Sequence, residues 1–285
     1  MDAPAITVIS KPGIAAGVAA ASFAGMALGA KGMPAPADAL ICLLCIFAAA
    51  SGSAMVNALI EEETDALMPR AAGRRRAIDR LGRQAAWTLA ASLVLSSVAV
   101  SLIFLGALTA ALIAAAAAGY ALAYTLWLKK NSPYGTVPGA VPGALPVLIG
   151  YSAATSTIGA DGVILFLVML LWQPPHFLAF ALKYKDQYEA AGIPVMPVSM
   201  GKGYTRLFMF IYASALPPLT LALWLFGYCG PFFAASAALL GVSYLAVTYV
   251  WVYRKDEPGR AFGASIFYML GVLGAVTLDM LPRSV

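Results

Sequence analysis

Residues 84–128 read QAAWTLAASLVLSSVAVSLIFLGALTAALIAAAAAGYALAYTLWL, which is 45 residues without a single Asp, Glu, Lys or Arg. A helix crosses the hydrocarbon core of a bilayer with roughly 20 apolar residues, so this stretch fits two crossings and a tight turn. Residues 207–253, 47 residues long, have the same property. Each of the two stretches therefore predicts a pair of transmembrane helices.

Five shorter charge-free intervals each fit a single crossing. They are residues 12–30, 39–60, 131–160, 162–182 and 261–278. Of the 285 residues, 61% are hydrophobic and only 11% are charged, whereas soluble domains carry about a quarter charged residues. This composition excludes a water-soluble globule. The sequence predicts an all-α polytopic membrane protein with nine transmembrane helices.

The positively charged residues indicate how these helices are oriented. Fifteen of the 18 Lys and Arg residues fall in the loops after the second, fourth, sixth and eighth predicted helices, and Lys11 precedes the first helix. By the positive-inside rule, those loops and the N-terminus are cytoplasmic, and nine crossings leave the C-terminus outside. The net charge of +5 is explained by this topology, so it gives no reason to expect nucleic acid as a partner.

Asn57, Glu61 and Asp65 form a first group of polar residues beside a membrane helix. At positions i, i+4 and i+8 they drift only about 80° around a helix, so all three are predicted to project from one face. Such oxygen ligands suit Mg²⁺, which binds through one or two carboxylates plus substrate phosphates. Arg70 and Arg74 follow within reach of phosphate oxygens. The alternative is an acidic helix end and a basic stop signal that only fix the topology.

A second polar group surrounds His176, the only histidine in the chain. It follows the pair Pro174-Pro175 in the sixth predicted helix, which is expected to kink there. Lys183 lies about two helical turns later and Asp186 offers another oxygen ligand. Histidine can ligate a metal or transfer protons near neutral pH. The alternative interpretation is a histidine with a purely structural hydrogen bond.

The two polar groups lie four predicted helices apart, which suggests an internal repeat. We expect one integral-membrane domain over 1–285, with pseudo-repeats of roughly 12–130 and 131–253 and a last helix at 261–281. Lys129 and the segment 132–136 add a further polar loop on the same side. The predicted helices thus surround a cavity that opens to the cytoplasm. Its natural occupant is an amphiphile with a diphosphate head and a long hydrocarbon tail.

Seven segments spread over most of the chain carry a family pattern. They are Lys11-Pro12-Gly13-Ile14, Asn57-x-x-x-Glu61-x-x-x-Asp65-x-x-Met68-x-Arg70-x-x-x-Arg74, Tyr124-Thr-Leu-Trp-Leu-Lys129, Ser132-x-Tyr134-Gly-Thr, Gly143-Ala-Leu-Pro146-x-x-Ile-Gly150-Tyr151, Leu171-Trp-Gln-x-Pro175-His176 and Tyr188-x-Ala-Ala-Gly-Ile-Pro194-Val-x-Pro197. With these segments the chain resembles the UbiA-type intramembrane prenyltransferases, and within them the branch that modifies haem.

The resemblance implies a reaction and a set of site residues. Mg²⁺ would bind farnesyl diphosphate, whose farnesyl group would pass to the 2-vinyl group of haem b, with addition of water, to give haem O. The implied metal ligands are Glu61, Asp65 and Asp186, and the implied catalytic residues are Asn57, Glu61, Asp65 and Asp186. The implied substrate-binding residues are Arg70, Arg74, Lys129, Tyr134, Lys183, Tyr188, His176 and Trp172. Tyr124, Trp127, Tyr134 and Trp172 would shield an allylic cation.

The resemblance also implies a location and partners. It places the protein in the bacterial cytoplasmic (inner) membrane as a multi-pass protein, and it suggests terminal-oxidase or haem A synthase assembly partners. Departures from the family pattern fall at the diphosphate end: Glu61 stands where the family has Asp, and Gln187 where it often has Asp. Two alternatives therefore stay open. One is a UbiA-type enzyme with a quinone or other aromatic acceptor, and the other is a haem-binding paralogue of reduced activity.

Overall fold

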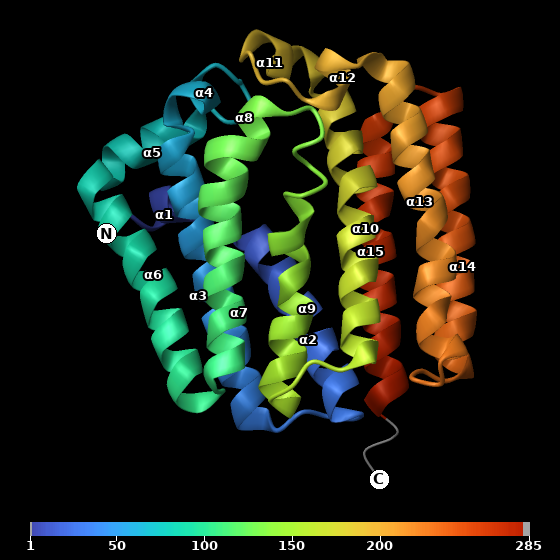
Figure 1. The fold of residues 1–285 in the computed structure, drawn as a ribbon. Coiled ribbons are helices and arrows are strands. Elements are labelled where there is room, and N and C mark those ends of the chain that lie inside the picture. Colours follow the sequence, from blue (N-terminus) through green and yellow to red (C-terminus); the bar gives the residue numbers. More distant parts are fainter. Residues whose placement is uncertain (1, 282–285) are drawn as a thin grey trace.

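The computed structural model describes residues 2–281, and every regular element in that range is a helix (Figure 1). The elements at the predicted crossings are α2 (Pro12–Ala30), α3 (Pro36–Ile60), α6 (Arg83–Phe104), α7 (Ala107–Ala118) continued by the π-helical η1 (Gly119–Leu128), α9 (Ala140–Thr155), α10 (Ala160–Lys183), α13 (Gly201–Leu225), α14 (Pro231–Thr248) continued by the π-helical η2 (Tyr249–Arg254), and α15 (Pro258–Met280). The predicted all-helical membrane bundle is confirmed.

The fifth predicted crossing is shorter than expected. Eight helices of the described residues are long and apolar enough to span a membrane, whereas α9 has only 16 residues. Residues 133–139 form turns instead of extending α9. Proline cannot donate a backbone hydrogen bond and disfavours helical geometry in the residue before it, and this segment contains Pro133 and Pro138. Nine full crossings are therefore not confirmed.

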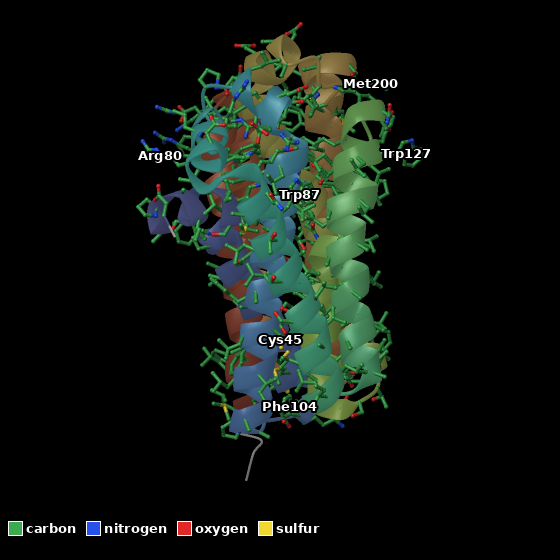
Figure 2. The ribbon with its side chains drawn as sticks, turned by 90° about the vertical axis from the view of Figure 1, so that its left-hand side faces the viewer. Cys45, Arg80, Trp87, Phe104, Trp127 and Met200 are labelled. Carbon is green, nitrogen blue, oxygen red and sulfur yellow. The ribbon has the colours of Figure 1, made fainter. Side chains whose placement is uncertain are left out.

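Six short helices accompany the long ones. One precedes α2, namely α1 (Ala3–Ser10), and five connect long helices: α4 (Glu62–Ala66), α5 (Gly73–Leu81), α8 (Lys129–Asn131), α11 (Lys185–Ala190) and α12 (Met196–Ser199). Figure 1 shows α4, α8, α11 and α12 together at one end of the bundle, which we call the polar end. Side-chain nitrogens gather there around Arg80, away from Cys45 and Phe104 (Figure 2). The loops predicted to share one side of the membrane therefore do share one end of the bundle.

Small residues let the inner helices approach closely. A Cβ atom on Gly25 of α2 would collide with the carbonyl oxygen of Val147 in α9, and one on Gly150 would collide with the carbonyl oxygen of Ser22. Such contacts between backbones are typical of membrane helices, which gain little from the hydrophobic effect against each other. Helix α10 runs unbroken through Pro174 and Pro175.

The predicted internal repeat stays a prediction, and two local features are compatible with it. The fourth and eighth predicted helices both end in a π-helical segment, η1 and η2. The second and sixth are both followed by a short helix at the polar end, α4 and α11.

Candidate active site

The acidic motif lies where α3 ends and α4 begins, at the polar end. Asn57, Glu61 and Asp65 are buried, with 3%, 3% and 1% of their surface exposed. The predicted single helix is interrupted, because Glu61 leaves helical geometry at φ −96° and ψ 9° and joins two helices. Backbone hydrogen bonds from Glu61 to Asn57 (3.0 Å) and from Asp65 to Glu61 (2.7 Å) cross this break. The i, i+4 spacing of the three side chains is therefore kept.

A cationic side chain from elsewhere in the chain binds each member of this motif. The contacts are Lys11 Nζ to Asn57 Oδ1 (2.6 Å), Lys129 Nζ to both Glu61 carboxylate oxygens (2.7 and 2.6 Å), and Arg74 Nη1 to Asp65 Oδ2 (2.6 Å). These cations come from the α1–α2 junction, α8 and α5. A buried carboxylate is costly without such a partner. Segments far apart in the sequence thus converge on one charged site.

Lys11 was not among the predicted site residues. It is the single residue between α1 and α2, and it takes the left-handed conformation (φ 51°, ψ 58°) that turns the chain sharply. For a lysine this conformation costs about 1 kcal/mol or more, and such strain concentrates at functional sites. Burial lowers the pKa of Lys11 to about 7, and repulsion from Arg74 adds to the effect. The only sequence signal for its role was the segment Lys11-Pro12-Gly13.

The donor set of this motif fits a magnesium ion that is shared with a substrate. Asp65 Oδ1 is buried and has no hydrogen-bond partner, so one carboxylate oxygen is available to a cation. Within the described residues, no group of three or more His, Cys, Asp or Glu side chains is placed to hold a metal. Asp186, the third predicted ligand, is exposed on α11. Mg²⁺ needs only one or two carboxylates when phosphate oxygens supply further ligands.

Arg70 is held by aromatic rings. Its guanidinium carbon lies 4.9 Å, 5.1 Å and 4.9 Å from the ring centroids of Phe180, Tyr184 and Tyr188. Its Nη2 also donates to Met68 Sδ (3.3 Å), while its Nε is buried without a partner. Each cation–π contact contributes about 0.5–1 kcal/mol or more when water is excluded. Arg70 therefore joins the loop after α4 to α10 and α11, and so links the two predicted polar groups.

Only some residues of the second polar group lie close to the first group. Tyr188 is buried against Arg70, as described above. Lys183 ends α10 and is exposed, with Nζ 5.0 Å from the ring centroid of Tyr184. Tyr188 thus contacts the first motif through Arg70, whereas Lys183 and Asp186 lie open at the polar end.

The aromatic residues predicted to shield a cation differ in their placement. Trp127 is 66% exposed and stands on the outer surface of the bundle (Figure 2). Tyr134 is 37% exposed, and its hydroxyl shares a hydrogen bond of 2.9 Å with that of Tyr204. Tyr124 stacks on Tyr120 with 6.0 Å between ring centroids. A shielding role for Trp127 is wrong, because its side chain points away from the bundle.

His176 lies in an aromatic stack between α10 and α15. Its ring centroid is 4.4 Å from that of Trp172 and 4.5 Å from that of Phe262. Its Nδ1 is 2.7 Å from Ser265 Oγ, and Trp172 Nε1 donates to the backbone carbonyl of Ser265 (2.7 Å). Phe262 also contacts Phe180, with 5.2 Å between centroids. Because Phe180 touches Arg70, a continuous row of rings leads from the polar end to His176.

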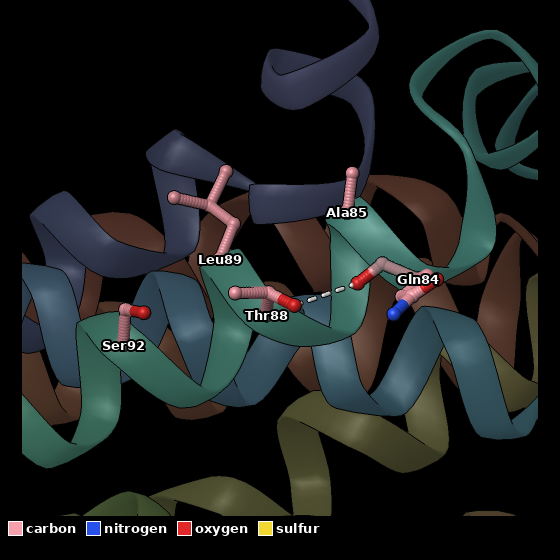
Figure 3. Close-up of a pocket in the computed structure, with 5 residues that line it drawn as sticks. All are labelled: Gln84, Ala85, Thr88, Leu89 and Ser92. Atoms are coloured by element: carbon pink, nitrogen blue, oxygen red, sulfur yellow. Dashed lines mark hydrogen bonds between the residues drawn. The ribbon is translucent and has the colours of Figure 1, made fainter.

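The pocket shown in Figure 3 lies on α6 and not at the polar site. Its lining residues, Gln84, Ala85, Thr88, Leu89 and Ser92, follow one side of this single helix. Thr88 Oγ1 donates to the carbonyl of Gln84 (3.0 Å). None of these side chains is charged or belongs to the predicted site, so this pocket carries no functional assignment. The cavity predicted at the polar end stays a prediction.

Residues 18–271 match the model of the UbiA prenyltransferase family. The chain belongs to the UbiA family. It is therefore a prenyltransferase, and its helical bundle is the multi-pass membrane fold of that family.

Similar proteins agree with this membership. A protein of Geotalea uraniireducens named protoheme IX farnesyltransferase is 46% identical over 90% of this chain and 100% of the relative. A protein of Aquifex aeolicus with the same name is 36% identical over 96% of this chain and 94% of the relative. The solved structure of a UbiA homolog from Archaeoglobus fulgidus, bound to DMAPP and Mg²⁺, has a TM-score of 0.72 at 14% identity and covers 96% of this chain and 99% of that one. The last similarity shows the UbiA fold alone.

Four further residues of this UbiA-family site escaped prediction. They are Thr125, Phe180, Phe262 and Ser265. Thr125 is buried, and its Oγ1 accepts a hydrogen bond from Asn57 Nδ2 (3.1 Å). Phe180, Phe262 and Ser265 lie in apolar helices outside the quoted segments, so only the assembled bundle reveals their role. Thr125 lies within the segment Tyr124-Thr-Leu-Trp-Leu-Lys129, but nothing in that segment indicates its contact with Asn57.

Proposed function

We propose that this chain is a haem farnesyltransferase, which transfers the farnesyl group of farnesyl diphosphate to the 2-vinyl group of haem b. The observation that carries the proposal is the 46% identity, over 90% of the chain, with a relative named protoheme IX farnesyltransferase. In this reaction the bond between farnesyl C1 and the diphosphate oxygen breaks, and diphosphate leaves with the electron pair. The allylic cation bonds to the terminal vinyl carbon, and water adds to the other vinyl carbon and loses a proton. The product is haem O.

The cations of the polar end stabilise the leaving diphosphate in this proposal. Lys11, Lys129 and Arg74 already point at the acidic motif and supply positive charge where the anion develops. Preorganised donors of this kind give the largest single contribution to many enzymatic rates. Arg70 and Lys183 are proposed as further anion-binding residues, with Tyr188 holding Arg70 in place.

Glu61 and Asp65 are the proposed ligands of Mg²⁺. The free oxygen of Asp65 supports this assignment, as does the bound Mg²⁺ of the Archaeoglobus fulgidus homolog. Bound there, the ion would neutralise charge on the diphosphate as a Lewis acid. Asn57, held between Lys11 and Thr125, orients the start of the motif. Asp186 stays a proposed further ligand, because it lies at the same end of the bundle.

The acceptor side is proposed at the aromatic stack of Trp172, His176 and Phe262. The row of rings from Arg70 through Phe180 and Phe262 connects this stack to the diphosphate side. Aromatic faces attract cations, so such a row also suits an allylic cation in transit. We propose that haem b binds with its porphyrin near His176. Tyr134 is proposed to border the substrate at the polar end.

A haem-binding paralogue of reduced activity is the second candidate, and one observation favours it. Both carboxylate oxygens of Glu61 accept hydrogen bonds from Lys129, so a metal at Glu61 would compete with the ammonium group for this carboxylate. Glutamate also reaches one methylene farther than the family's aspartate. A small shift of the diphosphate can lower the rate of transfer strongly even where binding persists.

We further propose a location in the bacterial cytoplasmic membrane, with the polar end and the N-terminus on the cytoplasmic side. The clustering of Lys and Arg at the polar end supports this orientation. The C-terminus, proposed to lie outside the cell, falls beyond the described residues. Terminal-oxidase or haem A synthase assembly partners are proposed as well.

Expression in cells that lack their own haem farnesyltransferase tests the function. We expect a new extracted haem at the mass of haem b plus farnesyl and water, resolved by reversed-phase chromatography with mass detection. Haem b alone, from membranes shown to contain the protein, would favour the second candidate. Prenylated quinones in the same extracts would show that the acceptor is another aromatic compound and not haem.

Replacing Lys11 with Met is expected to raise the KM for farnesyl diphosphate by about tenfold or more. A hydrogen bond to a charged group contributes about 1.5–3 kcal/mol, and 1.4 kcal/mol is tenfold in affinity. Lys11→Arg, which keeps the charge, is expected to lose less. Lys31→Met is the matched control, since Lys31 has the same left-handed backbone (φ 51°) at the other end of α2. An equal change in both Met variants would contradict a specific role of Lys11.

A further inference from the structure

The hydrogen bonds of Ser265 determine which nitrogen of His176 carries the proton. Ser265 Oγ lies 2.6 Å from the carbonyl oxygen of Phe262 and donates to it, because a carbonyl can only accept. The hydroxyl has a single proton, so at the 2.7 Å contact with His176 the proton must come from Nδ1. His176 is enclosed by the rings of Trp172 and Phe262 and forms no ion pair with a described residue. A neutral ring is therefore expected, with a bare lone pair on Nε2.

The orientation of the His176 ring is also restricted. The planes of Trp172 and Phe262 are each tilted by 27° from the imidazole plane, and both rings stack on it. Trp172 is in turn held by its hydrogen bond to the Ser265 carbonyl. Ser265 thus acts twice, since its backbone fixes the tryptophan and its hydroxyl fixes the histidine.

The second nitrogen of His176 has no partner among the described residues. It is also not among the fully buried polar atoms that lack a hydrogen bond, so it keeps some accessible surface. This nitrogen is therefore accessible to a ligand from outside the protein. Histidines that ligate metals donate their other N–H to an oxygen acceptor, which fixes the tautomer and strengthens the ligand. His176 has this arrangement, with Ser265 as the acceptor.

We propose that Nε2 of His176 binds the iron of the haem substrate and that Ser265 is the positioning residue for this bond. The inference rests on the proposed function, because it takes haem as the acceptor. A general base would gain from a carboxylate beside the ring, and no described carboxylate contacts His176 or Ser265. The iron bond would hold the porphyrin beside the row of rings that leads to Arg70.

Ferrous haem b titrated into the purified protein tests this inference. Absorption and resonance Raman spectra are recorded in detergent, with a purification tag that contains no histidine. Because the chain has one histidine, any iron–imidazole band must come from His176. We expect this band in the parent protein and its loss in His176→Gly, with recovery on addition of free imidazole.

The positioning role of Ser265 has its own signature. Ser265→Ala is expected to shift the iron–imidazole stretch to lower frequency and to weaken haem binding by about tenfold, the usual effect of losing such a partner. Ser265→Thr keeps the hydroxyl and is expected to restore both values. Thr277→Val is the matched control on α15, because Thr277 Oγ1 donates only to its own helix at Leu273 (2.9 Å).

The outcomes separate this inference from the proposed function. A parent protein that binds haem without an iron–imidazole band, or a band that Ser265→Ala leaves unshifted, would overturn the inference. If Ser265→Ala does not fold, recovery of the band by imidazole in His176→Gly still tests the iron bond. Ser265→Cys is then used in place of Ser265→Ala to measure the frequency of the iron–imidazole stretch. A histidine-ligated haem without farnesylated product would leave the inference standing and remove the proposed function. Farnesylated product without the band would overturn the inference and leave the proposed function standing.

Discussion

Asp65→Ala is expected to reduce farnesyl transfer by about 100-fold or more. Loss of a single preorganised group that stabilises developing charge commonly has this effect, and Asp65 is also a proposed metal ligand. Its Oδ1 is the buried oxygen without a partner, and its Oδ2 is bound by Arg74. The measurement is the rate of haem O formation at saturating farnesyl diphosphate, in membranes with equal amounts of protein.

Glu63→Ala provides the matched control for this experiment, because Glu63 is an exposed carboxylate in the same short helix. It is expected to keep nearly full activity. Asp65→Ala should still be extracted as a folded membrane protein, and its residual activity should no longer respond to Mg²⁺. Activity that persists in Asp65→Ala and still depends on Mg²⁺ would refute the metal assignment.

Lys129→Met is expected to lower the free energy of unfolding by about 3 kcal/mol. Removing one partner of a buried ion pair leaves an uncompensated charge, which typically costs about 3–5 kcal/mol. The side chains of Lys129 and Glu61 are 14% and 4% exposed, so water replaces the lost partner poorly. Thermal unfolding of the purified protein in detergent measures the effect.

Two further variants identify the cause. Adding Glu61→Gln to Lys129→Met should recover most of the lost stability, because the uncompensated charge is then gone. Lys202→Met is the control, since Lys202 pairs with Asp256 where the two side chains are 51% and 56% exposed. Exposed pairs contribute about 0–1 kcal/mol. Equal losses for Lys202→Met and Lys129→Met would show that burial of the pair is not the cause.

The membrane helices could be predicted because they depend on local sequence. The charge-free interval 12–30 coincides with α2, and the interval 39–60 lies within α3. An apolar stretch of sufficient length forms a crossing whatever its neighbours are. The exception, α9, shows the limit of that argument. Length and lack of charge predicted a full crossing there, but Pro133 and Pro138 leave residues 133–139 in turns.

The pairing of charges could not be predicted, because it depends on the assembled bundle. Lys11 meets Asn57 across 46 positions, and Lys129 meets Glu61 across 68. The contact of His176 with Ser265 spans 89 positions. The acidic residues were identified from their spacing, but no local pattern indicates which cation reaches which carboxylate.

The π-helical segment η1 changes how this part of the sequence must be compared with related sequences. Thr125 Oγ1 bonds to the carbonyl of Tyr120, and the backbone N–H of Lys129 bonds to that of Tyr124, each five positions back. A π turn holds an extra residue, and each residue of an α-helix advances about 100° around the axis. A helical wheel that advances by the same angle for every residue from Ala107 onward therefore places Lys129 on the wrong side of the helix. For the same reason, a one-residue gap between Gly119 and Leu128 in an alignment indicates that the Lys129 ammonium group is rotated relative to Glu61. Such a gap is therefore not a harmless change of length.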